Sequence, residues 1–361
     1  MKRILFVFNA VPDSERKGIY GECASFKTVS NLHQALLAGG NEVYLLNART
    51  PLQVQEEVAQ LPTIDLAFVI AEGFLDVPDT LYDGTGSQKI RQVIQQLGIP
   101  TSHSDIECME VCRHKDYTYE ALRKRGIKIP QFITITQKTN WDTCFADGQL
   151  GFPLFVKPAG GGNSVGISEN SIVANMEQLK QQALALFAEL GDVTLLAETY
   201  LPGQEYTIGV IGNGVKTVLP IVGFPTSKRV RCIKTKRYEY KERESFQLIT
   251  SEDPRYWQLY DIASATFDAV GASDVIRLEV REDINKVPHV IDVNGTPSLS
   301  TGASLTYMAE YLSITFDQLI NVIIYNCFNR YGIVPGQKLQ ELVYEPKLKL
   351  KAYGREVEQA V

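Results

Sequence analysis

The chain has 361 residues, which is enough for two or three lobes with buried cores. Its apolar content of 44% and charged content of 22% are those of an ordinary globular protein in water. The net charge of −6 argues against a general affinity for nucleic acid, and no stretch of the sequence is long and apolar enough to predict a membrane span.

The first residues, MKRILFVFNA, combine two basic side chains with a short apolar run, as a secretory signal peptide would. The run breaks at Asn9 and Pro12, and no small-residue cleavage site precedes Asp13, so a first β-strand is the better interpretation. The six cysteines are scattered and lack the paired spacing of a zinc site. We therefore expect reduced thiols and a cytoplasmic protein.

The first hundred residues alternate between strand-like and helical patterns. Apolar runs at 3–9, 42–46 and 65–70 predict strands, and the segments 24–38 and 86–97 predict helices between and after them. This order is typical of an α/β domain with a parallel sheet.

The rest of the chain predicts a second sheet and a further group of strands and helices. The predicted helices are 115–126, 172–190 and 257–270, and the predicted strands are 131–136, 152–158, 194–201, 276–280 and 289–294. Residues 226–245 form a basic insertion without a regular pattern. The tail, 335–361, contains Pro346, predicts no defined element and is expected to be peripheral.

Residues 152–168, FPLFVKPAGGGNSVGIS, place a lysine at a strand end and a glycine-rich loop directly after it. Glycines allow close approach of backbone N–H groups to a ligand, and Lys157 supplies a point charge, so the segment is suited to phosphate oxygens. The order of residues is not that of a Walker loop, because Lys157 precedes the glycines. The triple glycine by itself is equally consistent with an ordinary hairpin turn.

Two later strands, IRLEV and HVIDVN, place polar side chains on one face if they pair. That face would carry Arg277, Glu279, Asp292 and Asn294, with Ile291 and Val293 turned away. Carboxylates packed together repel unless a cation lies between them, and an oxygen-only set fits Mg²⁺. The alternative is a solvated hairpin face with an Arg–Glu pair. The segment 295–305, GTPSLSTGASL, follows and offers donors for a small carboxylate.

Glu198 and Glu205 flank Pro202 and Gly203 in the stretch LLAETYLPGQEYTIGVIG. A strand–turn–strand connection with a carboxylate on each side can hold the amino group of adenine and the hydroxyls of ribose. Two surface glutamates are the ordinary explanation when this stretch is considered alone.

Together with LGIPTSHS and Lys115 in CRHKDYTYEALRKRGIKIP, these stretches resemble the ATP-grasp superfamily, and within it the D-alanine–D-alanine ligase branch. The resemblance extends over roughly residues 3–330 in consistent order. It implies an α/β protein with an N-terminal Rossmann-like pre-ATP-grasp domain followed by a two-lobed ATP-grasp fold. The implied division is 1–105 for the N-terminal domain, 106–192 for the small lobe, 193–335 for the C-terminal lobe with metal and acceptor sites, and 336–361 for the tail.

The resemblance also implies a role for individual residues. The implied nucleotide contacts are Lys115 and Lys157 on the phosphates, Gly161, Gly162, Asn163 and Ser164 in the loop over them, Glu198 and Glu205 on purine and ribose, and the backbone of Thr199 and Leu201 at the hinge. The implied ligands of two Mg²⁺ ions, which Mn²⁺ can replace, are Glu279, Asp292 and Asn294. The implied catalytic set is Arg277 on the transferring phosphoryl group, Ser164 in the loop, Glu22 on the substrate amine and Ser304 on the acceptor carboxylate. Ser300 is the alternative to Ser304, and the register around Glu22 stays open by a residue or more.

The activity implied is that of an ATP-dependent carboxylate–amine ligase, which activates a carboxylate as an acyl phosphate and releases ADP and phosphate. Its partners would be small carboxylate and amine substrates, at least one of them an amino acid, in a homodimer without nucleic acid or membrane. Four departures from the family pattern cluster at the substrate pockets: Glu72 where a histidine is usual, Asp292 for glutamate, Ser298 for glycine and Asn163 for a hydroxyl residue. The ATP-dependent chemistry is therefore better supported by the sequence than the substrate D-alanine.

Four other functions stay open. The chain could be a true D-alanine–D-alanine ligase of cell-wall synthesis, or a secondary-metabolism ligase similar to the mycosporine type. It could also be an ATP-binding module without catalysis, although Lys115, Lys157 and Arg277 are intact. Finally, the basic segment 227–243, interleaved with Tyr238 and Tyr240, could bind nucleic acid.

Overall fold

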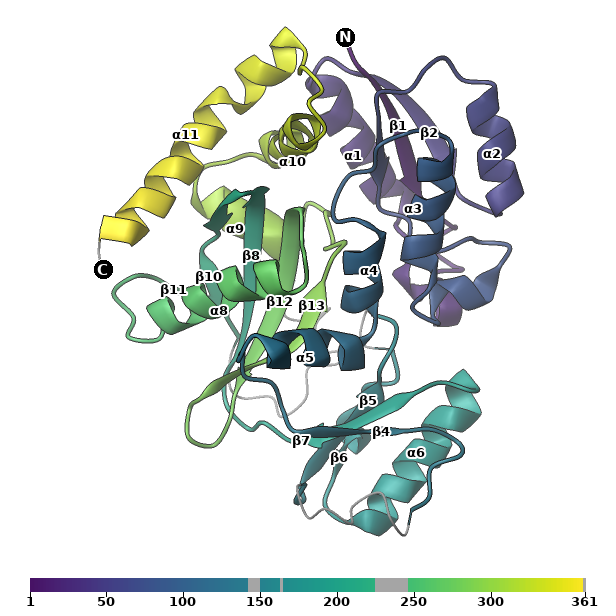
Figure 1. The fold of residues 1–361 in the computed structure, drawn as a ribbon, viewed down its shortest axis with the longest axis vertical. Helices are drawn as coiled ribbons and strands as arrows, with labels where there is room; N and C mark the ends of the chain where they lie inside the picture. The colour runs from purple at the N-terminus through teal and green to yellow at the C-terminus, as the bar shows by residue number, and fades with distance from the viewer. Residues whose placement is uncertain (142–149, 163–164, 225–245, 360–361) are drawn as a thin grey trace.

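The computed structural model describes residues 1–141, 150–162, 165–224 and 246–359. In these residues the chain forms three β-sheets with helices packed against them (Figure 1). The basic insertion predicted at 226–245 lies outside the described residues. No described helix is both long and apolar enough to cross a lipid bilayer.

The N-terminal part is built on a parallel sheet in the order β2-β1-β3. Its strands are β1 (Arg3–Phe8), β2 (Glu42–Asn47) and β3 (Leu66–Val69), and its helices are α1 (Phe26–Ala38), α2 (Pro51–Ala59) and α3 (Gly86–Gln96), with 3₁₀ turns η1 (Gly18–Glu22) and η2 (Pro78–Leu81). Strand β1 is buried from Ile4 onward, because helices cover both faces of the sheet, and this explains its unbroken apolar run. The predicted parallel sheet is confirmed.

The small lobe is an antiparallel sheet in the order β4-β7-β5-β6, shown at the bottom of Figure 1 with α6 against it. Its elements are β4 (Phe132–Ile135), β5 (Leu154–Pro158), η3 (Glu169–Ser171), β6 (Ile172–Val173), α6 (Met176–Leu190) and β7 (Leu195–Thr199). Strand β7 pairs with both β4 and β5, so this sheet continues past residue 192. We therefore propose a lobe boundary near residue 200.

The helix predicted over 172–190 is wrong at its start. Ile172 and Val173 form β6, where Val173 pairs with Leu154 of β5. Helix α6 begins only after Asn175, whose side chain accepts a hydrogen bond from the backbone N–H of Gln178. The β-branched pair favours the strand, and the asparagine cap fixes where the helix starts.

The central sheet has the order β11-β10-β8-β12-β13, with β9 paired to β8. Its strands are β8 (Glu205–Asn213), β9 (Val215–Val218), β10 (Ile221–Gly223), β11 (Gln247–Ile249), β12 (Asp274–Glu282) and β13 (Pro288–Asn294). The helices of this part are α8 (Tyr256–Ala269), α9 (Ser304–Tyr311) and α10 (Phe316–Arg330). Two short helices, α4 (Ile106–Arg113) and α5 (Lys115–Lys124), contact β13, and Figure 1 shows α5 between this sheet and the small lobe.

The N-terminal part and the central sheet share a core. Buried Phe6 and Phe68 of the N-terminal sheet belong to the same apolar cluster as Leu32 of α1 and Phe328 of α10. The side chain of Asn321 in α10 donates a hydrogen bond of 2.7 Å to the carbonyl of Ala35. These contacts fix the N-terminal part on the body of the protein.

The tail, for which the sequence predicted no element, forms helix α11 (Gln337–Gln359) with Pro346 inside it. It runs along the outside of the molecule next to α10, and it carries buried apolar residues, Leu339 and Val343. Cys23, Cys108, Cys112 and Cys327 are free thiols, and the other two cysteines lie outside the described residues.

Candidate functional site

A cleft of about 640 Å³ lies between the N-terminal part, the small lobe and the central sheet. Fourteen of the predicted site residues line it: Glu22, Lys115, Lys157, Gly161, Gly162, Glu198, Thr199, Leu201, Glu205, Arg277, Glu279, Asp292, Asn294 and Ser304. The other two, Asn163 and Ser164, lie outside the described residues. Glu22 and Ser304, which are 282 residues apart in the chain (304 minus 22), therefore meet at one cavity.

Lys157 at the end of β5 contacts three oxygen atoms around the cleft. Its Nζ lies 2.8 Å from Oε1 of Glu198 on β7, and it donates to the hydroxyl of Tyr119 at 3.0 Å. The Tyr119 hydroxyl in turn donates to Oε2 of Glu198 at 2.8 Å. Burial first, and then the Glu198 carboxylate, raise the pKa of Tyr119 well above its usual range, so this hydroxyl stays protonated as a donor.

The backbone of β13 completes this arrangement through a β-bulge. Glu279 of β12 pairs with Asp292, but Val280 pairs with Val290, so Ile291 has no partner residue on β12. The carbonyl of Ile291 accepts a hydrogen bond from Lys157 Nζ at 3.1 Å, and it lies 3.0 Å from the Tyr119 hydroxyl, whose single proton it shares with Glu198. The bulge thus directs a backbone acceptor of the central sheet to a lysine of the small lobe.

The polar face predicted on β12 and β13 is present. The strands are antiparallel, with Arg277 opposite Asn294 and Glu279 opposite Asp292. The prediction that Ile291 points away with Val293 is wrong, because the bulge gives its place in the core to Val290. Ile291 lines the cleft instead.

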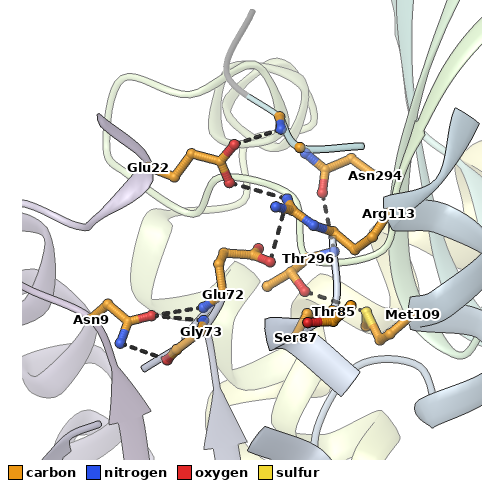
Figure 2. Close-up of polar contacts among 12 residues, drawn as sticks. Asn9, Glu22, Glu72, Gly73, Thr85, Ser87, Met109, Arg113, Asn294 and Thr296 are labelled. Atoms are coloured by element: carbon orange, nitrogen blue, oxygen red, sulfur yellow. Dashed lines mark hydrogen bonds and ion pairs between the residues drawn. The ribbon is translucent and has the colours of Figure 1, made fainter. Parts of the chain in front are cut away.

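Both carboxylates of this face lie next to cations. Arg277 lies 3.1 Å from Oε1 of Glu279, and Lys115 Nζ lies 3.4 Å from Oδ1 of Asp292. The Asn294 side-chain oxygen accepts the backbone N–H of Thr296 at 3.1 Å, which leaves that oxygen one further lone pair (Figure 2). Among the described residues, no three His, Cys, Asp or Glu side chains converge, so the candidate donor set is two carboxylates and an amide.

The glycine loop is attached to the start of α5. The backbone N–H of Lys115 donates to the carbonyl of Ala159 at 2.9 Å, and Lys115 Nζ donates to the carbonyl of Gly161 at 3.0 Å. Gly161 has a φ of 77°, a left-handed conformation that favours glycine. Lys115 therefore contacts both the loop and the carboxylate of Asp292.

At the other end of the cleft, Glu22, Arg113 and Glu72 form a cluster that connects the loop to the N-terminal part (Figure 2). Glu22 accepts the backbone N–H of Gly162 at 2.5 Å through Oε1, and Arg113 Nη1 at 3.1 Å through Oε2. The same Nη1 lies 3.5 Å from Oε2 of Glu72. We call these three side chains the Glu22–Arg113–Glu72 cluster.

Burial raises the pKa of Glu72 to about 7, the nearby Arg113 opposes this shift, and the Glu22 carboxylate adds to it. Arg91 and a hydrogen bond from Ser87 also favour the ionised form. For Arg113, burial alone would lower the pKa, but Glu22 and Glu72 together raise it above its usual value. Arg113 therefore stays a cation, and the Glu72 carboxyl takes up a proton more readily than an exposed glutamate does.

The remaining predicted residues lie at the cleft as follows. Glu205 at the start of β8 lies 3.4 Å from Arg281, and Leu201 is buried. Ser304 is the first residue of α9 and is buried, while Ala303 holds the N-cap position without a side-chain cap. Ser304 therefore lies one residue after the N-cap position and does not cap the helix.

Sequence reasoning did not assign roles to Tyr119, Arg113 and Glu72. Tyr119 lies four residues after Lys115 on α5, a spacing that places both side chains on one helix face. Arg113 ends α4 two residues before Lys115, and nothing in the local pattern predicts its partners. Glu72 stood out only as a departure from a family pattern.

The family model described as D-ala D-ala ligase C-terminus matches residues 121–325 of this chain. Among curated proteins, D-alanine–D-alanine ligase A of Bacillus cereus is 27% identical over 67% of this chain and 75% of its own length. D-alanine–D-alanine ligase A of Salmonella typhimurium is 34% identical over 51% of this chain and 45% of its own length.

Solved structures with the same fold include D-alanine–D-alanine ligase from Bacillus anthracis complexed with ATP, with a TM-score of 0.70 and 22% identity over 92% of this chain and 99% of that one. VanG D-Ala:D-Ser ligase from Enterococcus faecalis has a TM-score of 0.68 and 16% identity, over 90% of this chain and 99% of that one. The α/β fold with an N-terminal domain and a two-lobed ATP-grasp body, expected from the sequence, is confirmed.

The raised pKa of Glu72 makes a prediction about stability. The pKa of this carboxyl rises from 4.5 to about 7 on folding, so proton binding stabilises the folded state. This stabilisation is complete below about pH 4.5 and is lost as the pH rises through about 7. The unfolding free energy of the wild type relative to Glu72→Gln should therefore fall over this window in urea titrations. Glu120→Gln, which removes the exposed partner of Arg123, is the control and should show no such trend. If the difference in unfolding free energy between the wild type and Glu72→Gln stayed constant with pH, the raised pKa of Glu72 would be contradicted.

Proposed function

The chain belongs to the family described as D-ala D-ala ligase C-terminus, and from this premise we propose that it joins a small carboxylate to the amine of an amino acid. It is an ATP-dependent ligase that forms a carbon–nitrogen bond. The observation that supports the proposed chemistry most is the paired face of β12 and β13. On this face Glu279 lies opposite Asp292, and Lys115 contacts the carboxylate of Asp292. A solvated hairpin face would not lie in a cleft beside a glycine loop.

The proposed reaction requires a phosphoryl transfer and then an acyl transfer in the same cleft. The first substrate's carboxylate oxygen attacks the γ-phosphorus of ATP, and ADP leaves. The amine nitrogen of the second substrate then attacks the acyl carbon, phosphate leaves, and the nitrogen loses a proton. No covalent bond to the enzyme is needed, so catalysis consists of positioning and charge neutralisation. We assign Lys115 and Lys157 to the ATP phosphates and Arg277 to the transferring group.

Lys157 and Glu198 contact each other directly, and this contact suits the assigned roles. A nucleotide whose purine lies at Glu198 and whose phosphates lie at Lys157 would replace part of the ion pair with its own groups. The hinge contacts are assigned to Thr199, Leu201 and Glu205. Apolar Phe155 and Ile291 line the same cleft and can cover a purine face.

We propose Mg²⁺ as the metal, held by Glu279, Asp292 and Asn294. The donors fit, because two opposed carboxylates and an amide offer oxygen ligands, and the two carboxylates face each other across one strand pair. When bound with ATP, Mg²⁺ neutralises phosphate charge and polarises phosphoryl oxygens. The sequence predicts two ions. The second would share the ligands Glu279, Asp292 and Asn294 and would also bind phosphate oxygens of the substrate.

For the substrates, we assign Glu22 to the amine of the first amino acid and Ser304 to the carboxylate of the second, with Ser300 as the alternative. The named relatives act on D-alanine, and D-alanine is one candidate here. We favour another substrate, because Arg113 and Glu72 place a buried ion pair beside Glu22 where the family usually has a histidine. Cytoplasmic location and a homodimer remain predictions from the sequence. The nucleic-acid alternative rests on residues 227–243, which lie outside the described residues.

The function is tested by an ADP-release screen over D- and L-amino acids, singly and in pairs, with Mg²⁺ and ATP. We expect one ADP and one phosphate to be released for each molecule of amide product, which is identified by mass spectrometry. Phosphate release without any amide, or no release with any pair, would overturn the ligase proposal for these substrates. D-alanine as the best substrate would favour the cell-wall alternative.

The metal assignment predicts the effect of Asp292→Asn. Loss of one anionic ligand weakens neutralisation of the phosphates, so kcat should fall by at least about a hundred-fold while the melting temperature changes little. The Mg²⁺ concentration for half-maximal rate should also rise. Asp283→Asn, on the turn between the two strands, is the matched control. Normal turnover and an unchanged Mg²⁺ requirement would refute the assignment.

The acceptor assignment predicts the effect of Ser304→Ala. Charged hydrogen bonds contribute about 1.5–3 kcal/mol, so the KM for the second amino acid should rise about ten- to a hundred-fold. The KM for ATP should stay constant, because Ser304 is assigned no nucleotide contact. Ser300→Ala is the parallel variant, and a rise in KM in that variant alone would transfer the role to Ser300.

A further inference from the structure

The segment that carries Glu72 is rigid. The buried side chain of Asn9 accepts the backbone N–H groups of Glu72 and Gly73 at 2.8 and 3.1 Å, and it donates to the carbonyls of Ala48 and Gly73 at 3.0 and 2.9 Å. Gly86 packs so closely on this segment that an added Cβ would lie 2.2 Å from the Glu72 carbonyl. The Glu72 carboxylate therefore projects from a backbone held on two sides (Figure 2).

Arg113 is held in turn by Glu72 and Glu22. The side chains of Arg113 and Glu22 are each 11% exposed and that of Glu72 is 13% exposed, so the charges are largely removed from water. Nε and Nη2 of Arg113 have no hydrogen-bond partner among the described residues, which leaves Nη1 as its contact with both carboxylates. A single nitrogen thus joins the rigid segment at Glu72 to the carboxylate of Glu22.

Glu22 has capacity left for a ligand. Its two oxygens offer about four acceptor positions, and two are taken by Gly162 and Arg113. An ammonium group can therefore bind Glu22 while both contacts persist. Gly162 lies so near that an added Cβ would be 3.0 Å from Glu22 Oε1 and 3.2 Å from Arg113 Nη1.

We propose that Arg113 and Glu72 are positioning residues, which hold the Glu22 carboxylate between the substrate amine and the glycine loop. Without them, Glu22 must lose its own rotational freedom when substrate binds, and binding is weakened by that cost. With them, the loop and the amine-binding carboxylate are fixed together, so the amino acid and the nucleotide should favour each other's binding. This inference rests on the proposed function for its assignment of the amine to Glu22.

The first experiment needs no amino-acid substrate. Binding of a non-hydrolysable ATP analogue with Mg²⁺ is measured by calorimetry for the wild type, Arg113→Met, Arg113→Lys and Glu72→Gln. We expect Arg113→Met to weaken binding by about five-fold, at the low end of typical couplings, and Arg113→Lys to restore most of it. The control is Arg123→Met, whose arginine is exposed and ion-paired only with Glu120 in the described structure. Equal affinities for wild type and Arg113→Met would overturn the connection to the loop.

The second experiment is a double-variant cycle on the KM for the first amino acid, with melting temperatures measured in parallel. Arg113→Met should raise this KM at least about ten-fold in the wild-type background and change it little in Glu22→Gln, since Arg113 acts only through Glu22. Equal effects in both backgrounds would overturn the proposal. If the wild type releases ADP with no amino acid, the proposed function has failed, and the analogue-binding experiment alone decides on the positioning role. If a variant does not fold, Arg113→Lys and Glu72→Gln complete the cycle.

Discussion

The buried ion pair between Lys157 and Glu198 is the contact on which the arrangement of the cleft depends. Burying two charges is costly unless their remaining hydrogen-bonding capacity is met, and here Tyr119 and the Ile291 carbonyl meet it. These groups come from β5, β7, α5 and β13. The need to satisfy one lysine and one glutamate therefore fixes the small lobe, a connecting helix and the central sheet at a common point.

The face of β12 and β13 shows what a strand pattern can predict. The two-residue period placed Arg277 with Glu279 and Asp292 with Asn294, and the observed register brings the pairs opposite each other. The period could not predict the bulge, because an extra residue is set by the fit between two strands and not by either one alone. For this reason Ile291 was expected on the face opposite Asp292 and Asn294, and it lies in the cleft.

Other features depend on contacts that no local pattern records. The alternation of strands and helices predicted the parallel N-terminal sheet, since each of its three strands contains a run of apolar residues. Helix α11 was not predicted, because Pro346 lies within it and its apolar residues find partners only in the folded body. Arg113 and Glu72 are 41 residues apart, by 113 minus 72, and their meeting is visible only in three dimensions.

The Glu22–Arg113–Glu72 cluster has no residue in common with the polar face of β12 and β13 and is built from different segments of the chain. Selection can therefore change positions 72 and 113 without changing the identity of the residues on the β12–β13 face. Exchanges in this corner would then change the recognition of the amine and, through the contact of Glu22 with Gly162, also the affinity for the nucleotide. Divergence within such a family is then expected to be concentrated at the N-terminal wall of the cleft, while the paired strands that carry Glu279 and Asp292 keep their residues.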